Sequence, residues 1–163
     1  MDWEIDIIHL FVSGGHNYRG RHGKGSLDHQ IEDPDLIECV AERGIRGDRF
    51  FDHQENFKGQ ITFFDHEVYN DVKKAFGLPD LAASVFRRNV VLRGVPLSEL
   101  IGKRFTIGGL EFEGTEEAAP CYWMNEAAAD GVHEFLKGQG GLRARILSGG
   151  TLKKGISSLS LVP

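Results

Sequence analysis

The stretch that decides the fold is KRFTIGGLEFEGT, residues 103–115. Phe105 and Ile107 come before a Gly-Gly pair, and Leu110 and Phe112 come after it. Apolar residues two positions apart point to the same face of a strand, and consecutive glycines supply the positive φ angles of a tight hairpin turn. This segment is therefore predicted to form a β-hairpin with one buried face.

Other apolar segments predict further strands around the hairpin, and residues 141–162 repeat its pattern. There, LRARIL (142–147) is expected to pair with TLKKG (151–155) across Ser148-Gly149-Gly150. The remaining strands are predicted at 6–12, 59–64 and 84–94. About six to eight short strands favour a mainly β fold, a small closed or strongly bent barrel with two or three peripheral helices. We expect residues 1–163 to form a single domain.

Helix signals bound two segments. DPDLIECVAERG (33–44) begins with a capping Asp33 and ends at Gly44, which predicts a helix with Cys39 packed on its buried side. DHEVYNDVKKAFG (65–77) has the same kind of signals at both ends and predicts a second helix. A short helical turn is expected at 96–102.

Charge and composition exclude several classes of protein. The formal net charge of −5 disfavours binding to nucleic acids or to anionic membranes. No apolar run reaches the roughly 18 residues of a membrane span, and the acidic start MDWEIDIIHLF does not resemble a signal peptide. Two cysteines do not make a disulfide framework, so we expect a cytoplasmic protein. Phosphate-loop, dinucleotide-binding and zinc-protease motifs are incomplete.

Cys121 is the most reactive side chain among the candidate site residues. It lies in EEAAPCYWMNEAAADG (116–131), after Pro120 and where a helix is expected to begin. A thiol at a helix N-terminus is favoured as a nucleophilic thiolate. A lone cysteine beside Trp123 and Met124 also fits simple core packing, and the local sequence leaves both interpretations open.

Two groups of polar residues could form a binding site with it. The glycine-rich loop SGGHNYRGRHGKGSLDHQ (13–30) carries three cations suited to an anionic group, and it fits a solvated loop equally well. The second group flanks apolar runs in RGIRGDRFFDH (43–53) and FRRN (86–89), as the rim of a pocket or surface turns would. The candidates are Arg19, Arg21 and Lys24 in the loop, and Arg46, Asp48, Arg49, Arg87, Arg88 and Asn89 in the second group.

Together these segments resemble the MOSC domain, named for the C-terminal part of molybdenum cofactor sulfurases. GIRGDRF (44–50) is similar to the family's early G-x-x-G-D-R segment. FRRNVVLRGVPLSELIGKRF (86–105) is similar to its R-x-N strand and the following L-x-x-x-I-G turn, and APCYW (119–123) falls where the family carries P-C. GGLRARILSGGTLKKG (140–155) resembles its closing strands.

The resemblance implies a barrel-like fold and a site built around Cys121. The family is associated with the pterin molybdenum cofactor and with sulfane sulfur carried as a cysteine persulfide. Carried over, Cys121 would be the sulfur carrier or a ligand of the metal. Arg46, Asp48, Arg49, Arg88 and Asn89 would line the pocket. The implied partners are a pterin or another anionic small molecule, and a cysteine desulfurase as sulfur donor.

Several functions remain open under this resemblance. The chain could be a sulfur carrier, a non-catalytic module that binds the molybdenum cofactor, a component of a reductase for N-hydroxylated compounds, or a barrel that binds some other small anion. Relatives often carry a second cysteine or an arginine just before the P-C cysteine. Here those positions are Glu117, Ala118 and Ala119, so no internal disulfide step is expected.

Overall fold

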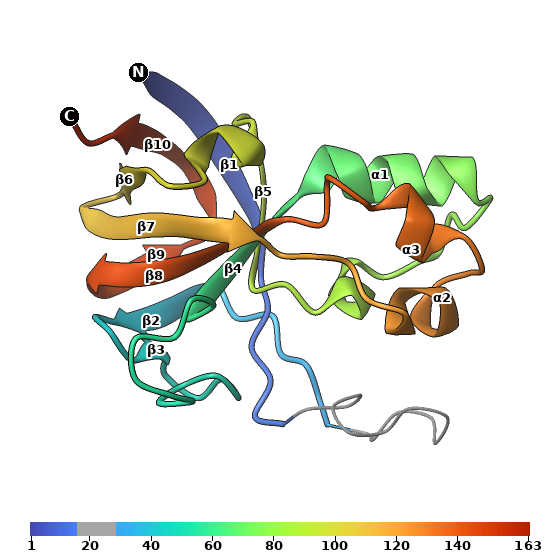
Figure 1. Ribbon diagram of the computed structural model, residues 1–163, viewed down its shortest axis with the longest axis horizontal. Coiled ribbons are helices and arrows are strands. Elements are labelled where there is room, and N and C mark those ends of the chain that lie inside the picture. The colour runs from blue at the N-terminus through green and yellow to red at the C-terminus, as the bar shows by residue number, and fades with distance from the viewer. Residues whose placement is uncertain (16–28) are drawn as a thin grey trace.

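The computed structural model describes residues 1–15 and 29–163, and its main element is a closed β-barrel (Figure 1). The barrel order is β1-β10-β6-β7-β8-β4-β5, and a separate three-stranded sheet has the order β3-β2-β9. This confirms the predicted mainly β fold. The strands are β1 (Asp2–Leu10), β2 (Leu36–Val40), β3 (Gly44–Ile45), β4 (Ile61–Asp65), β5 (Val90–Arg93), β6 (Arg104–Ile107), β7 (Leu110–Glu117), β8 (Leu142–Ser148), β9 (Gly150–Lys153) and β10 (Gly155–Leu161).

The three α-helices lie together beyond one end of the barrel, away from the two chain termini (Figure 1). None of the helices in the described part of the chain has the length and apolar character needed to cross a membrane. Their bounds are α1 (His66–Ala75), α2 (Trp123–Ala127) and α3 (Val132–Phe135), with 3₁₀ turns η1 (Ala83–Phe86) and η2 (Leu97–Leu100).

The hairpin predicted at 103–115 is present as β6 and β7. Phe105 lies opposite Phe112 and Ile107 lies opposite Leu110. Gly108 and Gly109 have φ angles of 54° and 88°, the left-handed conformations that a two-residue hairpin turn requires. The four apolar side chains point into the barrel, where the two phenylalanine rings stack with centroids 5.5 Å apart.

A β-α-β crossover leads to the site. β4 and β5 are parallel neighbours, so the chain between them must cross the barrel end, and it does so through α1 and η1. Helix α1 begins where the sequence predicts, because the Asp65 side chain accepts a hydrogen bond from the backbone N–H of Glu67. The predicted strand 84–94 is shorter than expected. Residues 83–86 are 3₁₀, and Arg87 to Asn89 form the connection into β5.

Two apolar clusters hold these layers together. The larger one fills the barrel and includes residues from the inner face of the small sheet, such as Ile37 and Leu152. The smaller one joins the outer side of β4 and β5 to the helices through residues such as Phe64, Phe86 and Met124. The second cluster fixes α2, and with it the chain around Cys121, against the end of the barrel.

The helix predicted at 33–44 is wrong, because residues 36–40 form strand β2. Leu36 and Glu38 are exposed while Ile37 and Cys39 are buried, which is the period of a strand and not of a helix. Asp33 caps no helix. Its carboxylate accepts hydrogen bonds from the backbone N–H of Leu10 and pairs with His9 at 2.8 Å. The packing predicted for Cys39 is confirmed, since this thiol is buried in the core.

The predicted pairing of LRARIL with TLKKG is also wrong. Strand β8 pairs with β7 on one side and with β4 on the other, so neither of its edges is available to β9. β9 pairs with β2 in the small sheet. Gly149 permits this change of sheet, because a Cβ there would lie 2.4 Å from the carbonyl oxygen of Cys39.

Candidate functional site

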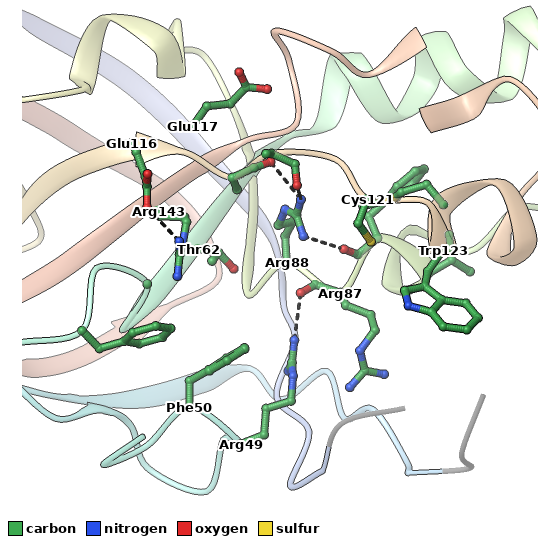
Figure 2. Close-up of a pocket in the computed structure, with 17 residues that line it drawn as sticks. Arg49, Phe50, Thr62, Arg87, Arg88, Glu116, Glu117, Cys121, Trp123 and Arg143 are labelled. Carbon is green, nitrogen blue, oxygen red and sulfur yellow. Dashed lines mark hydrogen bonds and ion pairs between the residues drawn. The ribbon is translucent and has the colours of Figure 1, made fainter. Parts of the chain in front are cut away.

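A cavity of about 390 Å³ opens between the end of the barrel and the helices. Its lining is contributed by distant parts of the sequence and includes four arginines against two glutamates. Figure 2 shows Glu116 and Arg143 at one side of this pocket and Cys121 and Trp123 at the other. The lining side chains with functional groups are Arg49, Thr62, Arg87, Arg88, Glu116, Glu117, Cys121, Trp123 and Arg143, together with Phe50 and Phe57.

Cys121 lies on the cavity wall and its side chain is exposed. It follows the end of β7 and comes two residues before α2, and its carbonyl accepts the N–H of Met124. Helix α2 has only five residues, so it is much shorter than the helix that the sequence suggests. The position excludes the core-packing interpretation of Cys121, whereas Cys39 is the buried cysteine of this chain.

Arg88 contacts the backbone around Cys121. Its guanidinium donates hydrogen bonds to the carbonyls of Phe86, Ala118, Ala119 and Gly140. Burial lowers the pKa of Arg88 to about 10, and the negative charge of an ionised Cys121 acts in the opposite direction. Arg88 therefore remains a cation at neutral pH.

Arg49 and Asp48 form a buried ion pair at 3.3 Å, with side chains 9% and 0% exposed. Arg49 faces the cavity, and Asp48 lies behind it. The Asp48 carboxylate also accepts the N–H groups of Ser13 and Phe50. Burial lowers the pKa of Arg49, and the charge of Asp48 opposes that shift. Arg49 also donates a hydrogen bond to the carbonyl oxygen of Arg87 at 3.1 Å, and its guanidinium carbon lies 4.8 Å from the centroid of the Phe50 ring.

Asn89 does not line this cavity. It is buried, and its side-chain oxygen accepts the backbone N–H of Thr62 at 3.0 Å. Its amide nitrogen donates to the carbonyl oxygen of Phe11 at 3.1 Å. Asn89 therefore ties together the ends of β4 and β1 beneath the cavity floor.

The other predicted residues lie elsewhere. Arg46 is exposed, pairs with Glu38 at 2.9 Å and is not among the residues lining the cavity. Arg19, Arg21 and Lys24 lie outside the described residues. The structure thus brings Cys121, Arg49 and Arg88 together in one cavity, with Asp48 and Asn89 behind its wall.

Arg143 is a cavity residue that was not among the candidates. It lies on β8, pairs with Glu116 at 2.8 Å and places its guanidinium carbon 5.1 Å from the centroid of Phe57. Gly59 leaves room for it, since a Cβ there would come within 2.7 Å of the Arg143 Nε atom. The alternation in LRARIL places Arg143 on the outer face of the barrel. Only the tertiary structure shows that this part of the outer face lines the cavity.

Arg87, one of the polar residues of the FRRN segment, also lines the cavity. It has a left-handed backbone conformation with φ 56°, and its guanidinium donates to the carbonyl oxygen of Gly15 at 2.9 Å. In FRRN, two consecutive arginines precede a strand whose first three residues are buried. A left-handed non-glycine residue beside a cavity is typical of functional sites.

Residues 29–157 match the family model of the MOSC domain. The match covers most of the chain, so this protein belongs to the MOSC domain family, as its motifs predicted. The family is associated with the molybdenum cofactor. A comparison with curated proteins gives no significant match.

Solved structures show the same fold. The YuaD protein from Bacillus subtilis is similar with a TM-score of 0.79 and 17% identity, over 100% of this chain and 98% of that one. YiiM from Escherichia coli has a TM-score of 0.67 and 18% identity, over 100% of this chain and 70% of that one. YiiM from Geobacillus stearothermophilus has a TM-score of 0.69 and 17% identity, over 98% of this chain and 75% of that one.

The cavity is suited to a small anionic ligand with a planar part. Its volume falls within the range of about 300 to 1,000 Å³ that is usual for cofactor and ligand pockets. The excess of arginine favours an anion in a chain that is acidic as a whole, and guanidinium groups bind phosphate well. Phe50, Phe57 and Trp123 add apolar surface. A phosphorylated pterin fits this donor set.

Proposed function

We propose that this protein binds the molybdenum cofactor in the arginine-lined cavity and carries sulfane sulfur as a persulfide on Cys121. The observation that carries the proposal is the exposed Cys121 thiol on the wall of a cavity with four arginines. Membership of the MOSC family supports the cofactor, and the exposure of Cys121 supports access by a sulfur donor.

Different residues of this cavity would bind the anionic groups and the ring system of the cofactor. Arg49, Arg87 and Arg143 would hold the phosphate and other anionic groups, and Phe50 and Trp123 would cover the planar ring system. When bound, the cofactor would supply a metal centre, and Cys121 would contribute its sulfur from the cavity wall. The described residues include no group of three or more His, Cys, Asp or Glu side chains that could hold a metal ion. The metal would therefore arrive with its cofactor.

Loading of Cys121 requires a persulfide donor, such as a cysteine desulfurase. The Cys121 thiolate attacks the terminal sulfur of the donor persulfide. A new S–S bond forms at Cys121, the S–S bond of the donor breaks, and the donor leaves as a thiolate. One sulfane sulfur and its proton move from one cysteine to the other, so the step needs no external oxidant or reductant.

The test is purification of the full chain from a host that synthesises the molybdenum cofactor. Metal content, fluorescence of the oxidised pterin and intact protein mass are measured for the wild type, Cys121→Ser and the control Cys39→Ala. We expect pterin and molybdenum in the wild type and the control. The serine variant should lose an adduct of about 32 Da, one sulfur atom, that the other two carry.

Two results would contradict the proposal in different ways. A persulfide on Cys121 without pterin in any preparation would contradict cofactor binding, and the protein would then be a sulfur carrier that does not use this cofactor. Equal pterin content and equal mass adducts in the wild type and Cys121→Ser would show that Cys121 neither carries the sulfur nor helps to bind the cofactor.

A further inference from the structure

The segment that carries Cys121 has no regular secondary structure of its own. β7 ends at Glu117 and α2 begins at Trp123, so residues 118–122 depend on tertiary contacts for their position. On one side they lie against the chain before β8. The N–H of Ala118 donates to the carbonyl oxygen of Gly141 at 2.8 Å, and a Cβ on Gly140 would lie 2.3 Å from the carbonyl oxygen of Ala118.

Arg88 holds this segment from inside. Its Nη2 atom donates to the carbonyls of Ala118 at 2.9 Å and Ala119 at 3.4 Å, and its Nε atom donates to Gly140 at 3.0 Å. Its Nη1 atom donates to the carbonyl of Phe86 at 3.2 Å. Figure 2 shows the guanidinium with dashed bonds in more than one direction, next to the Cys121 segment. One side chain thus joins the chain after β7, the chain before β8 and its own 3₁₀ turn.

The donors of Arg88 are therefore already committed to the protein backbone. A guanidinium has five N–H groups, and four hydrogen bonds of Arg88 end on main-chain carbonyls. No described carboxylate forms an ion pair with it within the usual distance, whereas Arg49 and Arg143 have such partners. A residue in this state offers little to an anionic ligand.

The backbone of Arg88 is also fixed. Arg87 before it ends η1 in the left-handed conformation, and Asn89 after it is held by hydrogen bonds with Thr62 and Phe11. The guanidinium accordingly projects from a rigid base and transmits that rigidity to residues 118–120.

We propose that Arg88 is a positioning residue that holds the Cys121 segment at the cavity, and that it does not bind the anionic groups of the ligand. Those groups are left to Arg49, Arg87 and Arg143. The inference rests on the proposed function only in taking Cys121 as the functional residue. Lysine cannot replace Arg88 in this role, because an ammonium group lacks the planar fork that reaches carbonyls on several sides.

The test uses hydrogen exchange measured by mass spectrometry on the full chain, without cofactor. Arg88→Lys is compared with the matched control Arg87→Lys, which makes the same chemical change one residue earlier in the same cavity. We expect exchange in peptides covering 117–122 and 138–142 to rise by roughly tenfold in Arg88→Lys, the effect of losing a charge-assisted hydrogen bond. Peptides from β6 and β7 up to residue 113 should not change, and the control should match the wild type.

A fluorine label on Cys121 reports the position of the sulfur itself. A thiol-reactive reagent that carries a trifluoromethyl group should label the exposed Cys121 and leave the buried Cys39 unlabelled. The ¹⁹F resonance should shift or broaden in Arg88→Lys and stay in place in Arg87→Lys. Methylguanidinium added to Arg88→Ala should restore the wild-type resonance.

The proposal is overturned if Arg88→Lys exchanges like the wild type, or if both variants raise exchange in the same peptides. Should substitution of Arg88 prevent folding, Gly140→Ala approaches the same segment from the other side, because the added Cβ would displace Ala118 and Pro120. Unchanged hydrogen exchange of residues 117–122 in Gly140→Ala would then contradict the proposal that contacts with Arg88 and Gly140 hold this segment in place. Neither readout depends on the cofactor, so these outcomes leave the proposed function untouched.

Discussion

Replacing Asn89 with alanine is expected to reduce stability, because it removes the three hydrogen bonds of this side chain, two from Thr62 and one to Phe11. The variant leaves the N–H of Thr62 and the carbonyl of Phe11 without their partners at the junction of β4 and β1. Each unsatisfied buried group costs about 1 to 3 kcal/mol, so the free energy of unfolding should fall by about 4 kcal/mol. For a chain of this size that corresponds to a decrease in Tm of about 8 to 16 °C.

The measurement is urea and thermal unfolding of the wild type and Asn89→Ala, followed by circular dichroism. Asn70→Ala is the matched control, because Asn70 is exposed on α1 and its side-chain hydrogen bond is to the exposed ring of His66 at 3.3 Å. The control should lie within about 0.5 kcal/mol of the wild type. A loss below about 1 kcal/mol for Asn89→Ala would refute the reasoning, because it would show that these hydrogen bonds contribute little to stability.

Three further predictions follow from the packing. Gly114→Ala should lower the free energy of unfolding in urea by more than about 2 kcal/mol, because the added Cβ would lie 2.1 Å from the Leu100 carbonyl oxygen. The control Gly14→Ala should be neutral, because no atom lies within 4 Å of the Cβ that it adds. Equal losses of stability in the two variants would contradict the contact at Gly114. Iodoacetamide should add once to the folded protein, at Cys121, and reach Cys39 only after unfolding; a second adduct on the native protein would show that the core is open. Burial raises the pKa of Cys39 to about 12 against 9.0 for a free thiol, so the unfolded chain loses this proton first as pH rises. Between about pH 9 and 12 the wild type should therefore lose stability faster than Cys39→Ala, by up to about 1.4 kcal/mol per pH unit, and parallel curves would contradict the shift.

Where the deciding signals are local, the sequence predicts the structure well. The hairpin around Gly108-Gly109 needs only a turn that accepts positive φ and apolar residues two positions apart. Helix α1 needs only the Asp65 cap and an amphipathic stretch. The MOSC motifs predicted the family, because short segments in a fixed order identify a fold whose long-range contacts are already known.

Local signals fail where two interpretations compete over a few residues. Asp33 and Gly44 have the character of helix ends, while LIECV alternates over only five positions. The strand forms because β9 and β3 provide partners for both of its edges, and neither partner is visible from residues 33–44. The pairing of β9 was missed for the same reason, since β8 already has a neighbour on each side.

The candidate site shows the same division. The sequence by itself predicted that Cys121, Arg49 and Arg88 lie near one another, and all three line one cavity. Only the tertiary structure decided that Arg143 lines the cavity. It also decided that the side chains of Asn89 and Arg88 donate hydrogen bonds to backbone carbonyls. The physical reason is that a cavity is formed by chain segments far apart in sequence. A polar side chain therefore acquires its role from the groups that long-range folding brings to it.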